Sequence, residues 1–284
     1  MKKVGFIGAG TVGTALAIKL SEKGYPVAAV ASRSTGSAQR LAGLVGGVRV
    51  LPDAQAVADV ADSVFITTPD GAIPSVATSV RWRMGQDVMH CSGADSLDVL
   101  ELARKAGANV GVFHPLQTFA GIEQAIANIA GSTFALEAEG PLLGQLKQMA
   151  SDLGGHWVVL KAGDKVLYHT AAVMACNYVV TLVKLATDLW ATFGVSQPEA
   201  TRALLPLLRG TLNNLATVGL PNCLTGPIAR GDTGTIRKHL VALEQRAPAL
   251  LSTYRELGRQ TVPVAVAKGR IDRERADEMQ RLLG

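Results

Sequence analysis

Short apolar runs alternate with amphipathic stretches through the first half of the chain. This alternation is typical of β-α units that build a parallel sheet with helices on its faces. Helices are expected between the strands, for example over residues 53–61 and 97–105; Asp95 and Ser96 precede the second as capping residues, and Gly107 follows it. The strands are expected at residues 4–7, 27–31, 48–51, 63–67, 87–89, 110–113, 133–136 and 157–160.

The pattern changes near Gly163 and Asp164, because beyond them apolar residues recur at helical spacing and no convincing strand appears. We therefore expect an α/β domain with a doubly wound, mostly parallel sheet over residues 1–162, followed by an all-α domain over residues 163–284. The expected helices of the second domain are a long one ending near residue 193, one beginning at residue 197, and others over 205–218, 233–245, 248–260 and 272–283.

Size and composition agree with two folded domains, since 284 residues exceed the usual span of one hydrophobic core. Hydrophobic residues make up 48% and charged residues 18%, a balance that argues against disorder. The net charge of +5 is spread along the chain without interleaved aromatic residues, so no nucleic-acid partner is expected. The scattered Cys91, Cys176 and Cys223 suit neither a disulfide framework nor a metal site, and they favour a reducing cytoplasm.

Two segments resemble membrane or export signals. The N-terminus pairs Lys2 and Lys3 with an apolar run, but its glycines argue against a signal peptide. Residues 166–183 lack formal charge, yet they include His169 and Asn177, so a buried helix is expected there and no membrane partner.

A glycine-rich turn follows the first expected strand and leads into a helical stretch. In a dinucleotide site, the glycine at the place of Gly8 permits the tight turn, the one at Gly10 lets the pyrophosphate approach the backbone, and the one at Gly13 lets the helix pack closely. The free N–H groups at the helix N-terminus then face the diphosphate. The turn predicts a Rossmann-type cofactor site and comprises Gly8, Ala9, Gly10, Thr11, Val12 and Gly13.

The second expected strand ends in Ser32, Arg33 and Ser34, where sites that prefer NAD place a carboxylate. A guanidinium can pair with a 2′-phosphate and the two hydroxyls can donate to it, so the expected cofactor is NADP(H). The alternative is that Arg33 is only a solvated surface charge.

Three later strand ends should face the same crevice, because ligands of open parallel sheets bind beyond the carboxyl ends of the strands. We expect the first two to contact the cofactor and the third to bind the substrate, although His90, Cys91 and His114 could also be structural. The candidates are Thr67, Thr68 and Pro69 after the first strand, Cys91 and Ser92 after the second, and His114 and Gln117 after the third.

The first long helix of the second half carries Lys165, His169 and Asn177. At about 100° per residue, His169 and Asn177 share one face and could share one pocket. They are therefore candidate catalytic residues, with packing against a partner subunit or a neighbouring helix as the alternative.

The chain resembles the NADP-binding domains of pyrroline-5-carboxylate reductase, ketopantoate reductase and the β-hydroxyacid dehydrogenases. Over nearly its whole length it resembles a bacterial Rossmann-like family whose C-terminal domain has unknown function. The resemblance implies a helical second domain and a homodimer in which helices from both subunits enclose the site. Besides the cofactor turn and residues 32–34, it rests on residues 90–94, 114–119, 168–169, 177–178 and 224–232.

The chain departs from the lysine and asparagine pattern of ketopantoate reductase and the β-hydroxyacid dehydrogenases. His169 takes a lysine-like place, Val173 stands where an asparagine could be, and Asn177 follows one turn later. We hypothesise that hydride passes beside Cys91 and Ser92 to a small C=O or C=N substrate while His169, as a group able to change protonation near neutral pH, supplies the proton. The alternatives are a non-catalytic NADP(H) sensor or scaffold, and a dehydrogenase working in the oxidative direction.

Overall fold

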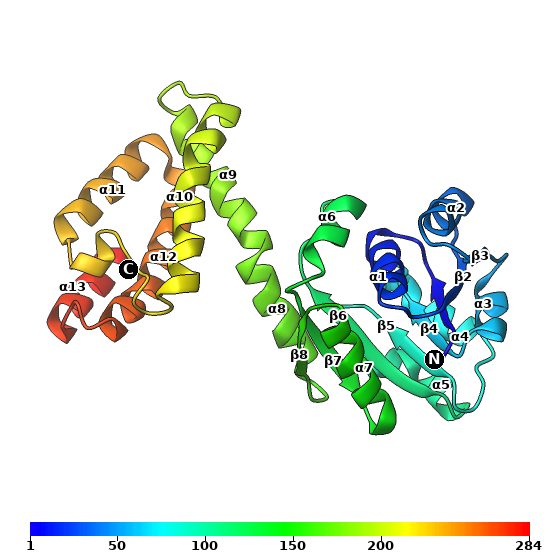
Figure 1. The fold of residues 1–284 in the computed structure, drawn as a ribbon. Coiled ribbons are helices and arrows are strands. Elements are labelled where there is room, and N and C mark those ends of the chain that lie inside the picture. The colour runs from blue at the N-terminus through cyan, green and yellow to red at the C-terminus, as the bar shows by residue number, and fades with distance from the viewer. The chain divides into compact units, whose positions relative to one another are not determined.

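An eight-stranded sheet forms the frame of the N-terminal part of the computed structural model, which describes residues 1–284 (Figure 1). Its strand order is β3-β2-β1-β4-β5-β6-β7-β8, and every neighbouring pair is parallel except β6 with β7. The expected mostly parallel α/β architecture is therefore confirmed. The strands are β1 (Val4–Ile7), β2 (Val27–Ala31), β3 (Arg49–Val50), β4 (Ser63–Ile66), β5 (Asp87–His90), β6 (Asn109–Leu116), β7 (Thr133–Ala138) and β8 (His156–Val159).

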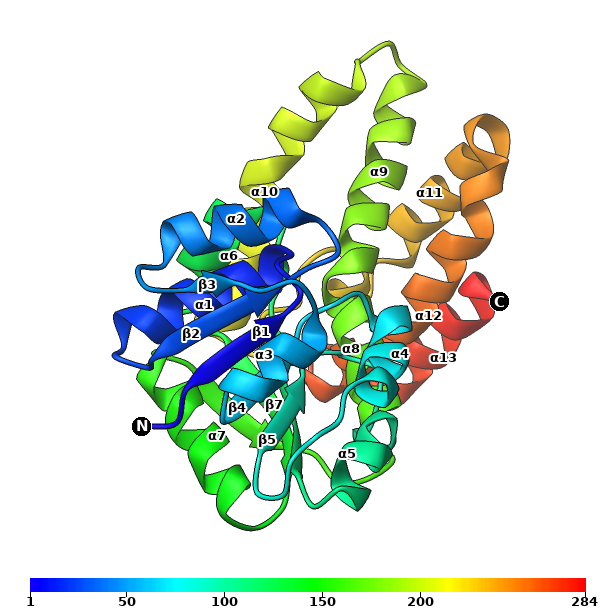
Figure 2. The same ribbon diagram turned by 90° about the vertical axis from the view of Figure 1, so that its right-hand side faces the viewer.

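Helices cover both faces of this sheet (Figure 2). One face packs against α1, α2, α6 and α7, and the other against α3, α4 and α5. The expected helix over 97–105 is a 3-10 turn continued by an α-helix, with Ser96 accepting from the Asp98 N–H as its cap. The helices are α1 (Thr11–Glu22), α2 (Thr35–Leu44), α3 (Ala54–Val60), η1 (Asp70–Ala72), α4 (Ile73–Ser79), η2 (Leu97–Leu100), α5 (Glu101–Lys105), α6 (Ile122–Asn128), α7 (Gly140–Asp152) and α8 (Lys165–Ala175).

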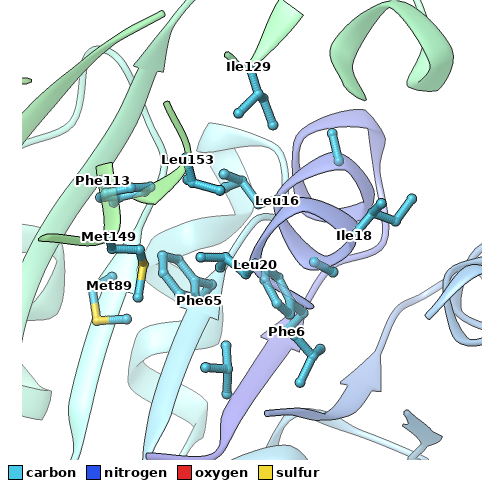
Figure 3. Close-up of a cluster of buried hydrophobic side chains, with 14 of the residues drawn as sticks. Phe6, Leu16, Ile18, Leu20, Phe65, Met89, Phe113, Ile129, Met149 and Leu153 are labelled. Atoms are coloured by element: carbon cyan, nitrogen blue, oxygen red, sulfur yellow. The ribbon is translucent and has the colours of Figure 1, made fainter. Parts of the chain in front are cut away.

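Successive side chains of the central strands enter opposite cores, as the twofold repeat of a strand requires. Phe65 of β4 joins the core under α1, while Val64 and Ile66 beside it join the core under α3 and α4. Figure 3 shows Phe65 with Phe6 and Leu20 between the strands and α1. The Phe6 and Phe65 rings stack with centroids 5.3 Å apart. This packing holds in place the ends of β1 and β4, next to the glycine-rich turn of residues 8–13.

Strand β6 continues past the expected end at residue 113 and runs to Leu116. His114 and Pro115 therefore lie inside a strand, where His114 pairs with Ala135 of the antiparallel β7. The expectation that His114 follows the strand was wrong, because pairing with a distant strand extends β6 beyond its apolar run.

The chain packs as two units, Met1–Cys176 and Asn177–Gly284, and the second is all-helical, as expected. Its core joins α11, α12 and α13 around Ile236, Val262 and Met279. The helices expected from residue 197 and over 205–218 are one helix, α10, which contains Pro206. The helices are α9 (Asn177–Ala191), α10 (Gln197–Thr217), η3 (Ile228–Arg230), α11 (Thr233–Arg246), η4 (Pro248–Leu250), α12 (Leu251–Ala267) and α13 (Arg273–Leu283).

The long helix expected to end near residue 193 is interrupted at Cys176, which separates α8 from α9. Lys165–Ala191 is long and apolar enough to cross a membrane, judged by length and composition alone. The apolar side chains of this segment are mostly exposed or half-buried within the single chain. Contacts within the chain therefore do not bury it as the buried helix that was expected over residues 166–183. Lys165 itself is buried in the first unit.

Candidate functional site

The turn between β1 and α1 packs tightly against the end of β4. Gly8 has a φ of 110°, and a Cβ there would lie 2.7 Å from the Thr67 carbonyl oxygen. A Cβ at Gly13 would lie 2.4 Å from the Thr67 Oγ1 atom. Thr67 Oγ1 also donates a hydrogen bond of 2.8 Å to the Gly8 carbonyl. Gly8 and Gly13 are therefore required by the protein itself, for the turn and for helix packing.

Gly10 differs, because a Cβ there would meet no atom within 4 Å. It is the N-cap of α1, and no side chain caps this helix. The first-turn N–H groups of α1 are left for another acceptor, and a helix N-terminus with free amides is a favourable anion site. Gly8, Ala9 and Gly10 line a cleft of about 890 Å³ beside this turn.

Ser32, Arg33 and Ser34 line the same cleft at the end of β2. The Ser34 hydroxyl caps α2 by accepting from the Ser37 N–H at 3.3 Å. The Arg33 side chain is exposed and takes part in none of the ion pairs or hydrogen bonds of the structure. Its guanidinium is thus free to pair with an anion in the cleft.

Thr67, Thr68 and Pro69 follow β4 and also line the cleft. Thr68 Oγ1 is buried without a hydrogen-bond partner, which leaves a hydroxyl for a bound group to satisfy. Sequence reasoning missed Asp53, which lines the cleft while its carboxylate accepts from the Ala56 N–H at 2.8 Å. The open Gly10, the uncapped helix, the free Arg33 and the unpartnered Thr68 together fit a phosphorylated dinucleotide.

The remaining predicted cofactor residues lie outside the cleft lining. Thr11, Val12 and Gly13 form the first turn of α1. Cys91 and Ser92 follow β5, the strand beside β4. Ser92 Oγ accepts from the backbone N–H groups of Ala94 at 3.2 Å and Asp95 at 2.9 Å and so shapes the turn after the strand.

A second cluster forms where the turn after β5 meets β6 and α8, all within the first unit. A Cβ at Gly93 would lie 2.6 Å from His169 Cδ2 and 2.9 Å from His114 Nε2. The Tyr168 hydroxyl lies 2.8 Å from His114 Nδ1. The His114 and His169 rings meet edge to face with centroids 6.4 Å apart. The structure thus brings together His114 and His169, two residues predicted from distant parts of the sequence.

Burial sets the protonation states in this cluster. Burial, with a smaller contribution from the nearby Lys165 charge, lowers the pKa of His114 to about 4. Burial also lowers the pKa of His90 to about 3, and it raises the pKa of Tyr168 to about 12. The Tyr168 hydroxyl can therefore donate a hydrogen bond to Nδ1 of neutral His114. In that tautomer Nε2 carries the ring proton and is a donor directed toward Gly93.

A buried lysine and glutamate lie beside the cluster, and sequence reasoning did not select them as site residues. Lys165 Nζ lies 3.9 Å from Glu137 Oε1, and neither atom has a hydrogen-bond partner. Burial lowers the pKa of Lys165 to about 8, while the Glu137 charge acts in the opposite direction. Burial raises the pKa of Glu137, and Lys165 opposes this rise. The two groups thus face each other as an ion pair that is longer than a hydrogen bond.

Gln117 and Asn177 take part in none of the contacts that define this cluster. The Gln117 amide donates to the Asn128 carbonyl and the Ser132 hydroxyl at 3.4 Å, and no hydrogen bond joins it to His114. Asn177 begins the second unit, beyond the break at Cys176. Their roles in substrate binding and catalysis stay predictions.

Family models match both parts of the chain. A Rossmann-like domain model covers residues 1–115, and a model described as a domain of unknown function, DUF2520, covers residues 132–261. The chain joins a Rossmann-like domain to a DUF2520 domain. The expected resemblance to a Rossmann-like family with a C-terminal domain of unknown function is thereby confirmed. No curated protein matches the chain.

Solved structures with this fold include several oxidoreductases. A candidate NADP oxidoreductase from Bacteroides fragilis has 26% identity and a TM-score of 0.72, covering 92% of this chain and 98% of its own. A reductive aminase from Aspergillus terreus, in complex with NADPH and ethyl-5-oxohexanoate, has 18% identity and a TM-score of 0.65, covering 100% and 92%. A 1-pyrroline-5-carboxylate reductase from Streptococcus pyogenes has 15% identity and a TM-score of 0.64, covering 99% and 98%. At these identities the last two similarities bear on the fold alone.

Proposed function

We propose that this protein is an NADP(H)-dependent oxidoreductase that transfers a hydride between the nicotinamide and a small C=O or C=N substrate. One observation carries the proposal. A cleft suited to a phosphorylated dinucleotide follows β1, β2 and β4, and a cluster of half-buried proton-bearing groups lies at the turn after the adjacent β5 and at His114 within β6. Ligands of such sheets bind beyond these strand ends, so a cofactor and a proton donor would meet there.

In this proposal the cleft residues hold the cofactor, which supplies the hydride chemistry when bound. Arg33 and the neighbouring hydroxyls bind the 2′-phosphate, and the amides of the first turn of α1 bind the pyrophosphate. His169 exchanges a proton with the substrate heteroatom as general acid or base. His114, kept neutral by burial and held by Tyr168, donates from Nε2 and orients the substrate. Gln117 and Asn177 complete the substrate contacts.

The substrate class rests on the chemistry of the cluster and on the similar structures. Imidazole and phenol groups can protonate an alkoxide or an amine that forms as hydride arrives, and no group of residues suited to holding a metal ion is present. The similar proteins from Aspergillus terreus and Streptococcus pyogenes are a reductive aminase and a pyrroline carboxylate reductase. We take a carbonyl or imine carbon as the hydride acceptor by analogy with these two enzymes, whose similarity to this chain shows only the fold.

We further infer a homodimer formed through the helical unit. Each of α9 and α10 has a single buried residue, Thr187 and Ala200 respectively. Their exposed apolar side chains include Val180, Leu207 and Leu212. Many exposed apolar side chains on long helices are characteristic of a protein interface.

The test is turnover with purified protein, NADPH or NADH, and a panel of keto acids, ketone and amine pairs, and cyclic imines. We expect loss of absorbance at the reduced nicotinamide band with at least one carbonyl or imine substrate, and preference for NADPH. Tight NADPH binding without turnover on any member of the panel would instead favour a sensor. Absence of NADPH binding would refute the proposal altogether.

A further inference from the structure

A cavity of about 490 Å³ in the second unit is lined by three cationic side chains and by no acidic one. Arg230 reaches it from η3, and Lys268 and Arg270 reach it from the end of α12. The cavity wall opposite α12 is the loop that precedes η3. This cavity takes no part in the site proposed above, which was built from first-unit residues and Asn177.

Lys268 holds this loop in place. Its ammonium donates to the Asn222 carbonyl at 2.8 Å and to the Leu224 carbonyl at 2.6 Å. An ammonium has three protons, so one remains for a further acceptor. Gly226 has a φ of 92°, a backbone conformation that favours glycine at this bend. The loop is therefore a fixed structure before any ligand arrives.

The loop also offers unused backbone donors. The N–H groups of Thr225, Gly226 and Ala229, all residues of the cavity wall, take part in no hydrogen bond. The flanking N–H groups do, since Leu224 donates to Pro221 at 3.2 Å and Arg230 donates to Pro227 at 3.1 Å. Several free amides in one short bend form the kind of concave backbone site that holds oxyanions.

The cationic side chains around the cavity form no ion pair within the chain, although the pKa of Asp232, lowered mainly by its hydrogen bonds from Thr235, is lowered further by the nearby Arg230 charge. Arg230 and Arg270 form no ion pair, whereas Arg259 pairs with Glu256 and Arg275 with Glu278 elsewhere in the unit. The nearest acids along the chain, Asp232 and Asp272, are both helix caps. Asp232 accepts from the Thr235 N–H and hydroxyl at the start of α11, and Asp272 accepts from the Arg275 N–H at the start of α13.

We propose that this cavity binds the oxyanion group, a carboxylate or a phosphate, of a small organic ligand. The free amides and the Lys268 ammonium contact the oxyanion, and Arg230 and Arg270 add charge-assisted hydrogen bonds. The cavity is larger than one such group, and Leu224 and Ala229 supply an apolar wall for the rest of the ligand.

The experiment is a titration of the full-length protein with inorganic phosphate and, separately, with acetate at constant ionic strength, followed by amide resonances. We expect saturable shifts at Thr225, Gly226 and Ala229 with at least one ion. Arg230→Gln and Arg270→Gln should each weaken that affinity about 10-fold, the effect of one lost charge-assisted contact. Arg202→Gln is the matched control, because Arg202 is exposed on α10 and outside the cavity lining.

Each outcome of the titration either supports or overturns the oxyanion site. A response to phosphate alone assigns the site to phosphate esters, and a response to acetate alone assigns it to carboxylates. Shifts confined to the turn between β1 and α1 would mean that the ion enters only the cofactor cleft and would overturn the proposal. Linear, unsaturable shifts, or equal weakening by Arg202→Gln, would do the same. Melting temperatures of all three variants verify that each is folded.

Discussion

Arg33 lies exposed at the cleft with no carboxylate paired to it, so its charge is available to a ligand. We expect Arg33→Ala to weaken NADPH binding by about 1.5–3 kcal/mol, the usual effect of losing a charge-assisted contact. NADH binding should hardly change, because NADH has no 2′-phosphate. Fluorescence titration with both cofactors measures this. Arg81→Ala, at an exposed arginine just before β5, is the control. Equal losses for NADPH and NADH would contradict the assignment.

His169 lies against Gly93 and edge to face with His114, a position that suits either proton transfer or packing. If it is the proton donor, His169→Ala should slow turnover by about 10²–10⁴ while NADPH binding persists. If it only packs the cluster, the melting temperature should fall while the rate per folded site stays nearly unchanged. Measuring both quantities on the same variant separates these roles, and near-normal turnover removes His169 from the mechanism.

The Lys165 and Glu137 pair is buried, and breaking such a pair leaves one uncompensated charge. We expect Lys165→Met to lower the free energy of unfolding by about 3–5 kcal/mol, and the double variant with Glu137→Leu to recover most of it. In the single variant the pKa of Glu137, which burial raises, loses the opposing effect of the Lys165 charge, so the folded protein holds the carboxyl proton to a higher pH than the unfolded chain does. Stability should then fall as pH rises above the ordinary carboxyl pKa of about 4.3, because the unfolded chain releases that proton first.

Urea unfolding of the wild type, both single variants and the double variant gives the coupling energy of this pair. A double variant whose loss of stability equals the sum of the two single-variant losses would mean that the two groups act independently.

At the residue scale, the sequence could predict the roles that a local motif determines, but not those that depend on contacts between distant parts of the chain. A short motif predicts the roles of Gly8, Gly10 and Gly13. In the structure a Cβ would be crowded at Gly8 and Gly13 and would meet no atom at Gly10. The buried Lys165, Glu137 and Thr68 could not be found in this way, because their lack of partners depends on elements far apart in the chain. An isolated lysine at the start of an uncharged helix was the one available signal for Lys165.

At the scale of elements, different glycines of the turn between β1 and α1 serve cofactor binding and folding. Gly10→Val should fold with an unchanged melting temperature yet lose dinucleotide binding, because its side chain enters the open cleft. Gly13→Val should lower the melting temperature as well, because its Cβ would overlap Thr67. Calorimetry and NADPH titration on the two variants test this contrast. NADPH affinity at the parental level in Gly10→Val would refute the assignment of the turn.

The sequence predicted the boundaries of elements that end at a local capping signal. It missed boundaries that depend on pairing between strands distant in the chain. Helix α11 begins at Thr233 as expected, since Asp232 caps it through a contact three residues away. The extension of β6 through His114 depends on the antiparallel β7, which apolar periodicity cannot reveal. In α10 the helix continues through Pro206, where the sequence suggested two helices, so the local cost of proline is outweighed there.

At the scale of the molecule, α9 and α10 carry an apolar surface for which the single chain provides little cover. Leu207 is 68% exposed and Val180 is 69% exposed. Replacing them in a monomer would change little, because neither makes a buried contact. In a homodimer joined through these helices, the same positions would be desolvated, and a charge there would be buried without a partner.

We therefore expect the wild type to sediment as a dimer at micromolar concentration and Val180→Glu/Leu207→Glu to sediment as a monomer. Two buried charges should cost several kcal/mol in association, enough to raise the dissociation constant by more than about 10³. Leu102→Glu is the control, since it adds the same charge to a leucine that is 51% exposed on α5. A wild-type monomer would refute the dimer, and a double variant that stays dimeric would move the interface elsewhere.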